Sequence, residues 1–295
     1  MLRWQVGSTT ITSVVESETP TSPRFLYRGM SKEYVLARAT AAPWLRPNFV
    51  DDRGYLLQKI QCLVIDDGTR RIAVDTCVGN DKRRHNQLWD GLSGPFLADM
   101  ATAGYSPETI THVVCTHLHV DHVGWNTTLV DGAWVPTFPN ARYLFVDAEY
   151  RHWKDEPGLF DNEDPFADSV APVVEAGLVD LVAPDHVIGG GIALQPTPGH
   201  TPGHVSVVVE DDGARAIITG DMVHHPMQLA DPGLSSVFDT DPAQSRATRL
   251  AVFPGWADGS TLVIGTHFGS PTAGRLVIDG DGYRLTPVTA GPSVG

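Results

Sequence analysis

Four potential metal ligands stand within six residues of one another: His117, His119, Asp121 and His122. Imidazole nitrogen and carboxylate oxygen suit zinc, iron, manganese and cobalt, and no thiolate cluster of the kind that closes a structural zinc site lies nearby. In extended backbone, the two-residue period would place the first three side chains on one side. The fourth would reach the same space only if the chain turned, and Gly124 is expected to allow a tight turn there.

A second set of candidates follows later in the chain, in Pro-Gly-His200, Thr-Gly-Asp221 and Gly-Thr-His267. Each candidate stands just past an apolar stretch. Loops that leave one end of a sheet often present convergent ligands, and glycines permit the sharp exits. A lone histidine is more often a core residue with ordinary hydrogen bonds. The clustered spacing of the first set favours metal ligands instead.

Short apolar stretches rich in β-branched residues predict strands on both sides of a helical middle. The expected strands are 11–15, 61–65, 72–74, 205–209, 216–219 and 261–264, and the expected helices are 94–103, 147–154 and 168–176. A further helix begins at Asp241, which can act as N-cap before Pro242 and Gln244. This order predicts an α/β fold, an αββα sandwich of two mixed sheets flanked by helices, as a single domain over residues 1–295.

Residues 20–55 are rich in proline and aromatic residues, which predicts an ordered excursion from that domain. It is expected either to cover the pocket or to form the interface of a homodimer. Gly189, Gly190 and Gly191 are followed by no phosphate-loop lysine and are expected to form a hairpin turn.

Composition narrows the classes of partner. Lys and Arg number 21 against 35 Asp and Glu, a net charge of −14, which opposes binding to nucleic acid or to an anionic membrane. No long apolar run marks a signal peptide or a membrane span, so a cytoplasmic location is expected. Cys62, Cys77 and Cys115 lie in or beside apolar stretches and are expected to be reduced core residues.

The pattern His-x-His-x-Asp-His, with a later His, Asp and His, resembles the signature of the metallo-β-lactamase superfamily at all seven positions. The resemblance implies the αββα fold and two divalent metal ions. Zinc is implied by analogy, and iron, manganese or cobalt are compatible. By the same resemblance His117, His119 and His200 hold one ion, Asp121, His122 and His267 hold the other, and Asp221 bridges them.

Two cations about 3.5–4 Å apart lower the pKa of a bridging water, which becomes a hydroxide nucleophile near neutral pH. Such a hydrolase needs no Ser or Cys nucleophile. Asp121 is expected to be both a ligand and a catalytic residue that shuttles a proton.

Within the superfamily, the aromatic N-terminal segment and the run 220–242 resemble the branch that contains methyl-parathion hydrolase and lactonases. This implies a small-molecule lactone, ester or organophosphate as substrate. Phe25, Tyr27, Trp44 and Phe49 are expected to line an apolar pocket for it. Trp125 departs from the second glycine of many relatives, and it either narrows the pocket or fills space.

The sequence favours several other functions of the superfamily less than it favours a lactonase. A glutathione thioesterase of the glyoxalase II type is the first alternative, although the sequence contains no clear basic cluster that would bind the glutathione carboxylates. A non-catalytic or redox metal-binding module is the second, and the intact ligand set and the lack of room for a flavin domain oppose it. RNA processing is disfavoured by the acidic charge. β-Lactamase activity is disfavoured by the expected location and by Asp221 at the bridging position.

The remaining histidines are assigned lesser roles. His204 is expected to fix its loop rather than bind metal. His224 and His225 either face the metals or complete the turn after Asp221, and the sequence leaves this open. The others are expected to be structural or at the surface: His85, His112, His152 and His186.

Overall fold

The computed structural model describes residues 1–155, 165–288 and 290. The described chain divides into two compact units, one formed by residues 1–16 and 60–184, the other by residues 17–59 and 185–292. The chain passes from one unit to the other within two long strands, β2 (Thr9–Thr21) and β3 (Leu56–Asp66). A single domain over the whole chain stays a prediction.

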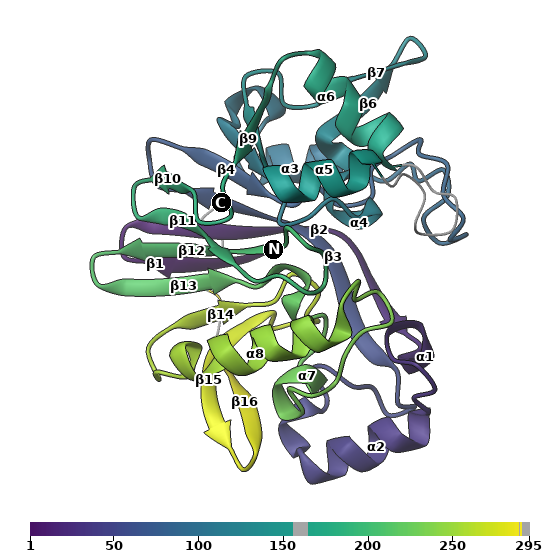
Figure 1. Cartoon of the computed structure of the whole chain (residues 1–295), viewed down its shortest axis with the longest axis vertical. Helices are drawn as coiled ribbons and strands as arrows, with labels where there is room; N and C mark the ends of the chain where they lie inside the picture. The colour runs from purple at the N-terminus through teal and green to yellow at the C-terminus, as the bar shows by residue number, and fades with distance from the viewer. Residues whose placement is uncertain (156–164, 289, 291–295) are drawn as a thin grey trace. The chain divides into compact units, whose positions relative to one another are not determined.

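The first unit is built on a seven-stranded mixed sheet in the order β1-β2-β3-β4-β5-β8-β9 (Figure 1). Its further strands are β1 (Leu2–Val6), β4 (Arg71–Val74), β5 (His112–Val114), β8 (Arg142–Val146) and β9 (Val179–Val182). β1 pairs antiparallel with β2, and β3 with β4, whereas β4, β5, β8 and β9 run parallel. A separate hairpin joins β6 (Thr127–Val130) and β7 (Ala133–Pro136). Because β4 and β5 are parallel, the loops that follow them leave the same edge of the sheet.

Helices and short helical turns connect these strands. They are α3 (Phe96–Thr102), η2 (Pro107–Thr109), α4 (Val120–Val123), η3 (Gly124–Asn126), α5 (Asp147–Asp155), the π-helical η4 (Phe166–Val170) and α6 (Ala171–Glu175). The unit has its own hydrophobic core, in which Phe96 and Met100 of α3 meet sheet residues such as Cys62 and Phe145. The burial of these apolar faces fixes the sheet and with it the origins of the loops.

The second unit contains the other seven-stranded mixed sheet, in the order β10-β11-β12-β13-β14-β15-β16. Its strands are β10 (Val187–Gly189), β11 (Ile192–Pro196), β12 (Val205–Asp211), β13 (Ala214–Ile218), β14 (Leu262–Ile264), β15 (Ala273–Asp279) and β16 (Gly282–Pro287). All neighbours are antiparallel except β13 and β14. Gly190 and Gly191 form the turn after Gly189, the last residue of β10, as expected for a hairpin, and all three glycines have a positive φ.

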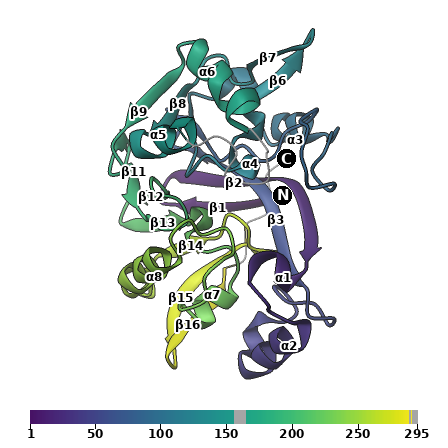
Figure 2. The ribbon, with the colours of Figure 1, turned by 45° about the vertical axis from the view of Figure 1, so that its right-hand side comes forward.

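The helical segments of this unit are α1 (Pro23–Leu26), α2 (Lys32–Ala41), η1 (Pro43–Leu45), η5 (Gly220–Met222), α7 (Met227–Ala230) and α8 (Pro242–Trp256). Figures 1 and 2 both show α8 beside β13 and β14. The Asp241 side chain accepts hydrogen bonds from the backbone N–H groups of Ala243 and Gln244, which confirms the expected N-cap.

The excursion 20–55 contains the helical segments α1, α2 and η1, and its inner face belongs to the core of the second unit. Tyr27 and Phe49 are at most 1% exposed and share one apolar cluster with Phe253, Trp256 and Phe268. These two aromatic side chains therefore help to stabilise the fold, while Phe25 remains 40% exposed and contacts Phe238.

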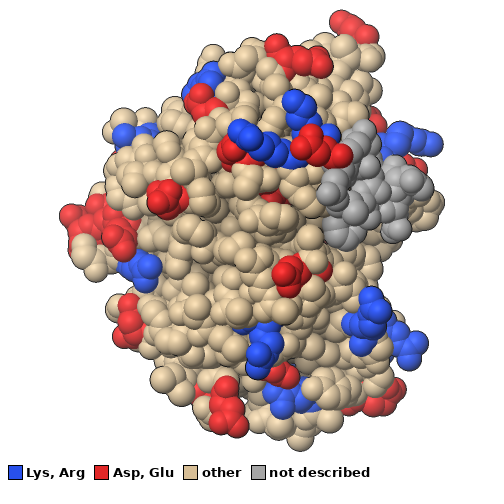
Figure 3. All heavy atoms as spheres, in the orientation of Figure 1, with Lys and Arg blue, Asp and Glu red and all other residues tan. Residues whose placement is uncertain are grey.

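Every expected strand and helix is present, and the two large mixed sheets with their helices confirm the α/β fold class. Among the described residues no helix is both long and apolar enough to cross a membrane. On the face that Figure 3 shows, acidic and basic side chains are interspersed, which agrees with a surface that offers no broad basic area there to a polyanion.

Candidate metal centre

The first ligand loop leaves the sheet of the first unit after β5. The backbone is extended at His119 (φ −70°, ψ 161°), and the short helix α4 begins at the next residue. The expected two-residue period therefore covers only His117 and His119. Asp121 and His122 come from a helical turn, so the expectation that Asp121 continues the extended run is wrong. A helical turn rotates consecutive side chains by about 100°, which is how neighbouring residues here are both brought toward the two histidines.

Within this unit the four side chains converge. His117 Nε2 lies 2.9 Å from His119 Nδ1, and the rings of His117 and His122 are 4.0 Å apart between centroids. His122 Nε2 lies 3.6 Å from Asp121 Oδ1. Imidazole nitrogens that face one another across such short distances are well suited to a shared cation, because a divalent ion accepts both lone pairs.

The chain turns at Gly124, as expected, because the short helical turn η3 begins there. Its φ is −58°, an ordinary helical value, so no left-handed conformation requires the glycine. A Cβ at Gly124 would lie 1.8 Å from the carbonyl oxygen of Val78, and a Cβ at Gly79 would lie 2.8 Å from the carbonyl carbon of Gly124. Glycine is needed at both positions because the loops after β4 and β5 pass at backbone contact. This close approach sets the depth of the ligand loop.

A buried carboxylate, that of Asp75, accepts hydrogen bonds from the same loop. Asp75, the first residue after β4, is 1% exposed and accepts hydrogen bonds from Thr116 N at 2.8 Å and Thr116 Oγ1 at 3.0 Å. Since that hydroxyl donates to the carboxylate, its oxygen accepts from His117 Nδ1 at 3.1 Å, which leaves Nε2 with a lone pair. Asp75 Oδ2 also lies 3.0 Å from His122 Nδ1. One carboxylate therefore orients two candidate ligands.

Two further acids, one buried and one partly buried, accept hydrogen bonds from the loop and from residues beside it. Glu149 of α5 accepts hydrogen bonds from Leu118 N at 3.0 Å and from Trp153 Nε1 at 2.6 Å. Glu16 accepts from Trp125 Nε1 at 2.7 Å and from two backbone N–H groups after β4. Burial raises the pKa of Glu16 against the effect of these hydrogen bonds. Trp125 itself is 3% exposed and stacks on Phe96, so it fills the core of its unit.

In the second unit the three later candidates also converge. Asp221, in η5 after β13, is 4% exposed. Its Oδ1 lies 3.0 Å from His267 Nε2, and its Oδ2 lies 3.6 Å from His200 Nε2. The two oxygens thus face different histidines.

Hydrogen bonds fix which ring nitrogen each of these histidines presents. His200 Nδ1 donates to Asp239 Oδ1 at 3.1 Å, and His267 Nδ1 donates to the carbonyl of Lys59 at 2.7 Å. Both rings therefore keep a lone pair on Nε2, the atom nearest Asp221. Burial alone would raise the pKa of Asp239, but its hydrogen bond with His200 holds that pKa below the ordinary value.

His204 fixes its loop, as expected. Its Nε2 accepts a hydrogen bond from the backbone N–H of Asp221 at 2.9 Å, and its Nδ1 contacts Thr197. A lone pair engaged by a backbone N–H is unavailable to a metal ion. The loop also depends on Gly199, whose φ is +132° and where a Cβ would lie 2.2 Å from Ser245 N.

The structure separates the two histidines that the sequence left open. His225 Nε2 donates to the carbonyl of Phe49 at 2.8 Å, and its Nδ1 accepts from Met227 N at 3.1 Å. It ties the excursion to the turn before α7 and is structural. His224 is 3% exposed, and its Nε2 lies 3.3 Å from Asp221 Oδ2. Burial lowers the pKa of His224 to about 3, so the ring is neutral.

The stability of the protein is expected to fall in acid because of His225. Burial lowers the pKa of His225 to about 4 from 6.5, so the unfolded chain takes up the proton first as the pH falls below 6.5. Stability is then lost between pH 6.5 and about 4, by about 2 kcal/mol between pH 7 and 5. Urea unfolding at both pH values measures this loss. His225→Gln should be less stable at pH 7 and show a shallower pH dependence, and an unchanged dependence would contradict the assignment.

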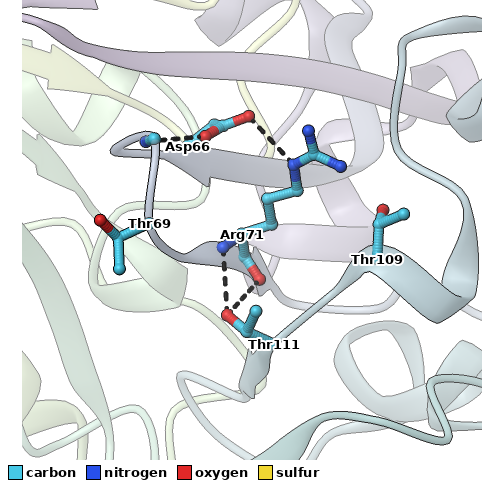
Figure 4. Close-up of a pocket in the computed structure, with 6 residues that line it drawn as sticks. Asp66, Thr69, Arg71, Thr109 and Thr111 are labelled. Carbon is cyan, nitrogen blue, oxygen red and sulfur yellow. Dashed lines mark hydrogen bonds and ion pairs between the residues drawn. The ribbon is translucent and has the colours of Figure 1, made fainter.

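The three cysteines are free and buried, as expected. Burial raises the pKa of Cys62, Cys77 and Cys115 above the ordinary thiol value, so they remain protonated and are poor metal ligands. A hollow of about 240 Å³ in the first unit contains no ligand residue; Asp66, Arg71 and Thr111 are among the residues that line it (Figure 4). The ligand loops, rather than this hollow, are the candidate site.

The sequence profile of the Metallo-beta-lactamase superfamily matches residues 58–256. The chain belongs to this superfamily. An N-acyl homoserine lactonase of Bacillus cereus is 26% identical over 204 residues, which cover 65% of this chain and 74% of the relative. Metallo-beta-lactamase domain-containing protein 1 of Xenopus laevis is 29% identical over 157 residues, 53% of this chain and 54% of that protein.

Solved structures show the metallo-β-lactamase fold. The hydrolase AbOPH superposes with a TM-score of 0.78 at 23% identity, covering 99% of this chain and 98% of that one. AidC, a dizinc quorum-quenching lactonase solved with the product N-hexnoyl-L-homoserine, superposes with a TM-score of 0.77 at 17% identity, covering 98% of each chain. The expected superfamily and hydrolase class are confirmed.

The sequence analysis did not predict the buried acids that hold the ligand loops and rings: Asp75, Glu149 and Asp239. Asp75 could have been found from the sequence, because it directly follows the buried strand 72–74. An acid in such a position is rarely buried unless it has hydrogen-bond partners. Glu149 and Asp239 reach the ligand loops from α5 and from the segment before α8, and only the tertiary structure shows those contacts.

Proposed function

We propose that this protein is a dinuclear metal-dependent lactonase that acts on small, uncharged lactones of the N-acyl homoserine type. The observation that carries the proposal is the chemistry of the donor set: imidazole Nε2 atoms and one carboxylate, oriented by buried acids, in a chain related to N-acyl homoserine lactonases. In metal sites, the ring nitrogen of a histidine that does not bind the metal typically donates a hydrogen bond to a carboxylate or a carbonyl, as it does here.

The assignment of ligands follows the superfamily pattern. His117, His119 and His200 would hold one ion, Asp121, His122 and His267 the other, and Asp221 would bridge them. Zinc is the proposed metal, in line with the dizinc lactonase AidC. The donor set fits it, because neutral imidazoles and a carboxylate are ordinary zinc ligands and thiolates are absent from the described loops.

Divalent ions held by these residues would supply Lewis-acid chemistry, lowering the pKa of water and polarising a lactone carbonyl. The residues of the chain do the rest. Asp121, 14% exposed at its side chain and at the start of α4, is positioned to carry a proton to the leaving oxygen. The buried acids keep the histidine rings from rotating, so that no reorganisation is required during the reaction.

Turnover of N-hexanoyl homoserine lactone by the zinc-loaded protein tests this proposal. We expect ring opening, measured as proton release, to disappear on dialysis against a chelator and to return with two equivalents of zinc. S-Lactoylglutathione, an aryl ester and a phosphotriester serve as parallel substrates. Metal binding without turnover of the lactone would refute the substrate, and preferential cleavage of S-lactoylglutathione would favour a glutathione thioesterase.

A homodimer and a cytoplasmic location stay predictions from the sequence. Light scattering of the purified protein tests the first, and a monomer would refute it.

A further inference from the structure

The imidazole of His224 is the least satisfied buried histidine in the described part of the second unit. The residue is 3% exposed, and neither Nδ1 nor Nε2 has a hydrogen-bond partner among the described residues. A buried polar group without a partner destabilises a fold, because it has lost its hydrogen bonds to water. Such a group therefore calls for a ligand or for another functional reason.

The backbone of His224 is held firmly although its ring is not. Its N–H donates to Gln228 Oε1 at 2.8 Å, and its carbonyl accepts from Gln58 Nε2 at 3.2 Å. The amide of Gln228 is itself fixed, since its Nε2 donates to the carbonyl of Leu234 at 3.0 Å. Two buried glutamines thus set the position of the residue and leave both ring nitrogens for something else.

The neighbouring His225 shows that this local structure can satisfy a buried histidine. Both of its nitrogens are engaged, by the carbonyl of Phe49 and by Met227 N. The two residues are adjacent and at most 3% exposed, yet only one ring lacks hydrogen-bond partners. The difference lies in direction: the ring of His224 faces Asp221, and that of His225 faces the excursion.

Around His224 the donor atoms have the spacing of a metal site. Its Nε2 lies 3.3 Å from Asp221 Oδ2, and His200 Nε2 lies 3.6 Å from the same oxygen. The rings of His224 and His200 are 4.7 Å apart between centroids. The ligand atoms of these three residues all lie within 4.8 Å of one another. Two imidazoles and one carboxylate are a complete protein ligand set for a catalytic zinc ion.

We propose that His224 is an additional metal ligand, which with His200 and Asp221 forms a three-ligand metal site within the second unit. The proposal rests on the proposed function, because it places one of the two metal ions of that enzyme. It follows that the second unit binds one metal ion on its own, without the histidines after β5. That ion can therefore bind before the other.

Cobalt(II) alone is the probe, because its visible absorption reports both stoichiometry and coordination. The wild-type protein is expected to bind two equivalents. His224→Ala should weaken one of them by 10-fold or more, the order of effect seen when the surroundings of a metal site are disturbed, and should change the absorption bands. The matched control is His186→Ala, which removes a partly exposed imidazole from the loop before β10 and should leave both ions in place.

A second background isolates the proposed site. The triple variant His117→Ala/His119→Ala/His122→Ala removes the imidazoles after β5 from both proposed ions and should keep one equivalent of cobalt, and adding His224→Ala should abolish it. Should His224→Ala misfold, as judged by circular dichroism of the metal-free protein, His224→Gln keeps most of the side-chain volume without an imidazole and replaces it throughout.

The outcomes separate the two proposals. Lactone turnover by a wild type that binds two ions, together with unchanged cobalt affinity and spectrum on removing His224 in both backgrounds, would overturn the inference and leave the lactonase standing. A wild type that binds no cobalt would overturn both. Two bound ions without lactone turnover, with one lost on removing His224, would refute the substrate alone.

Discussion

Replacement of Asp221 by Asn is expected to lower kcat/KM about 10³-fold and to reduce the bound metal from two equivalents to one or fewer. Both oxygens of Asp221 face imidazole Nε2 atoms, Oδ1 at 3.0 Å from His267 and Oδ2 at 3.6 Å from His200. An amide offers one oxygen and turns an N–H donor toward the other position. It also removes a negative charge that offsets the charge of two cations.

Metal content by plasma mass spectrometry and initial rates on the lactone measure this effect together. Asp241→Asn is the matched control, because it makes the same carboxylate-to-amide change at an exposed residue of the same unit. Asn caps helices as well as Asp does, so α8 should keep its stability. Two retained equivalents of metal and full activity in Asp221→Asn would show that Asp221 is not a bridging ligand.

Replacement of Asp75 by Ala is expected to lower the free energy of unfolding by about 4 kcal/mol and the metal affinity by 10- to 100-fold. The change leaves the N–H and the hydroxyl of Thr116 buried without their acceptor. Each such loss destabilises by about 1–3 kcal/mol. The rings of His117 and His122 also lose the group that orients them.

Urea unfolding of the metal-free protein measures the first effect, and competition with a chelator measures the second. Asp66→Ala is the control in the same unit. Figure 4 shows the Asp66 carboxylate bonded to Arg71 at the partly exposed end of β3, where such a pair is worth about 1 kcal/mol or less. Similar destabilisation by the two substitutions would mean that the Asp75 network contributes no more than a surface ion pair.

Much of the candidate site follows from local sequence. The six-residue run from His117 to His122 is short enough that its side chains must stay close, whatever the fold. The strands were predictable because β-branched residues alternate or cluster in short runs, and the Asp241 cap was predictable because capping depends on residues two and three positions away.

The sequence pattern was less informative about backbone conformation inside the ligand loop. It indicated extended backbone through Asp121 and a turn at Gly124. The structure has a helix from Val120 in place of the extended backbone, whereas the expected turn does begin at Gly124, where contact with Val78 also requires a glycine. Helix and strand differ little in local energy over four residues, so packing against the loop after β4 decides between them.

The sequence by itself determined the family, the α/β fold class and the residue types of the ligand set, because these depend on patterns that short segments carry. Only the tertiary structure decided which acids orient the ligands, since Asp239 reaches His200 across 39 residues and Asp75 reaches Thr116 across 41. It also gave two adjacent histidines different roles: His225 bonds to the excursion, and His224 is a candidate ligand. Ring direction depends on which buried partners surround a side chain, and those partners come from segments far apart in the chain.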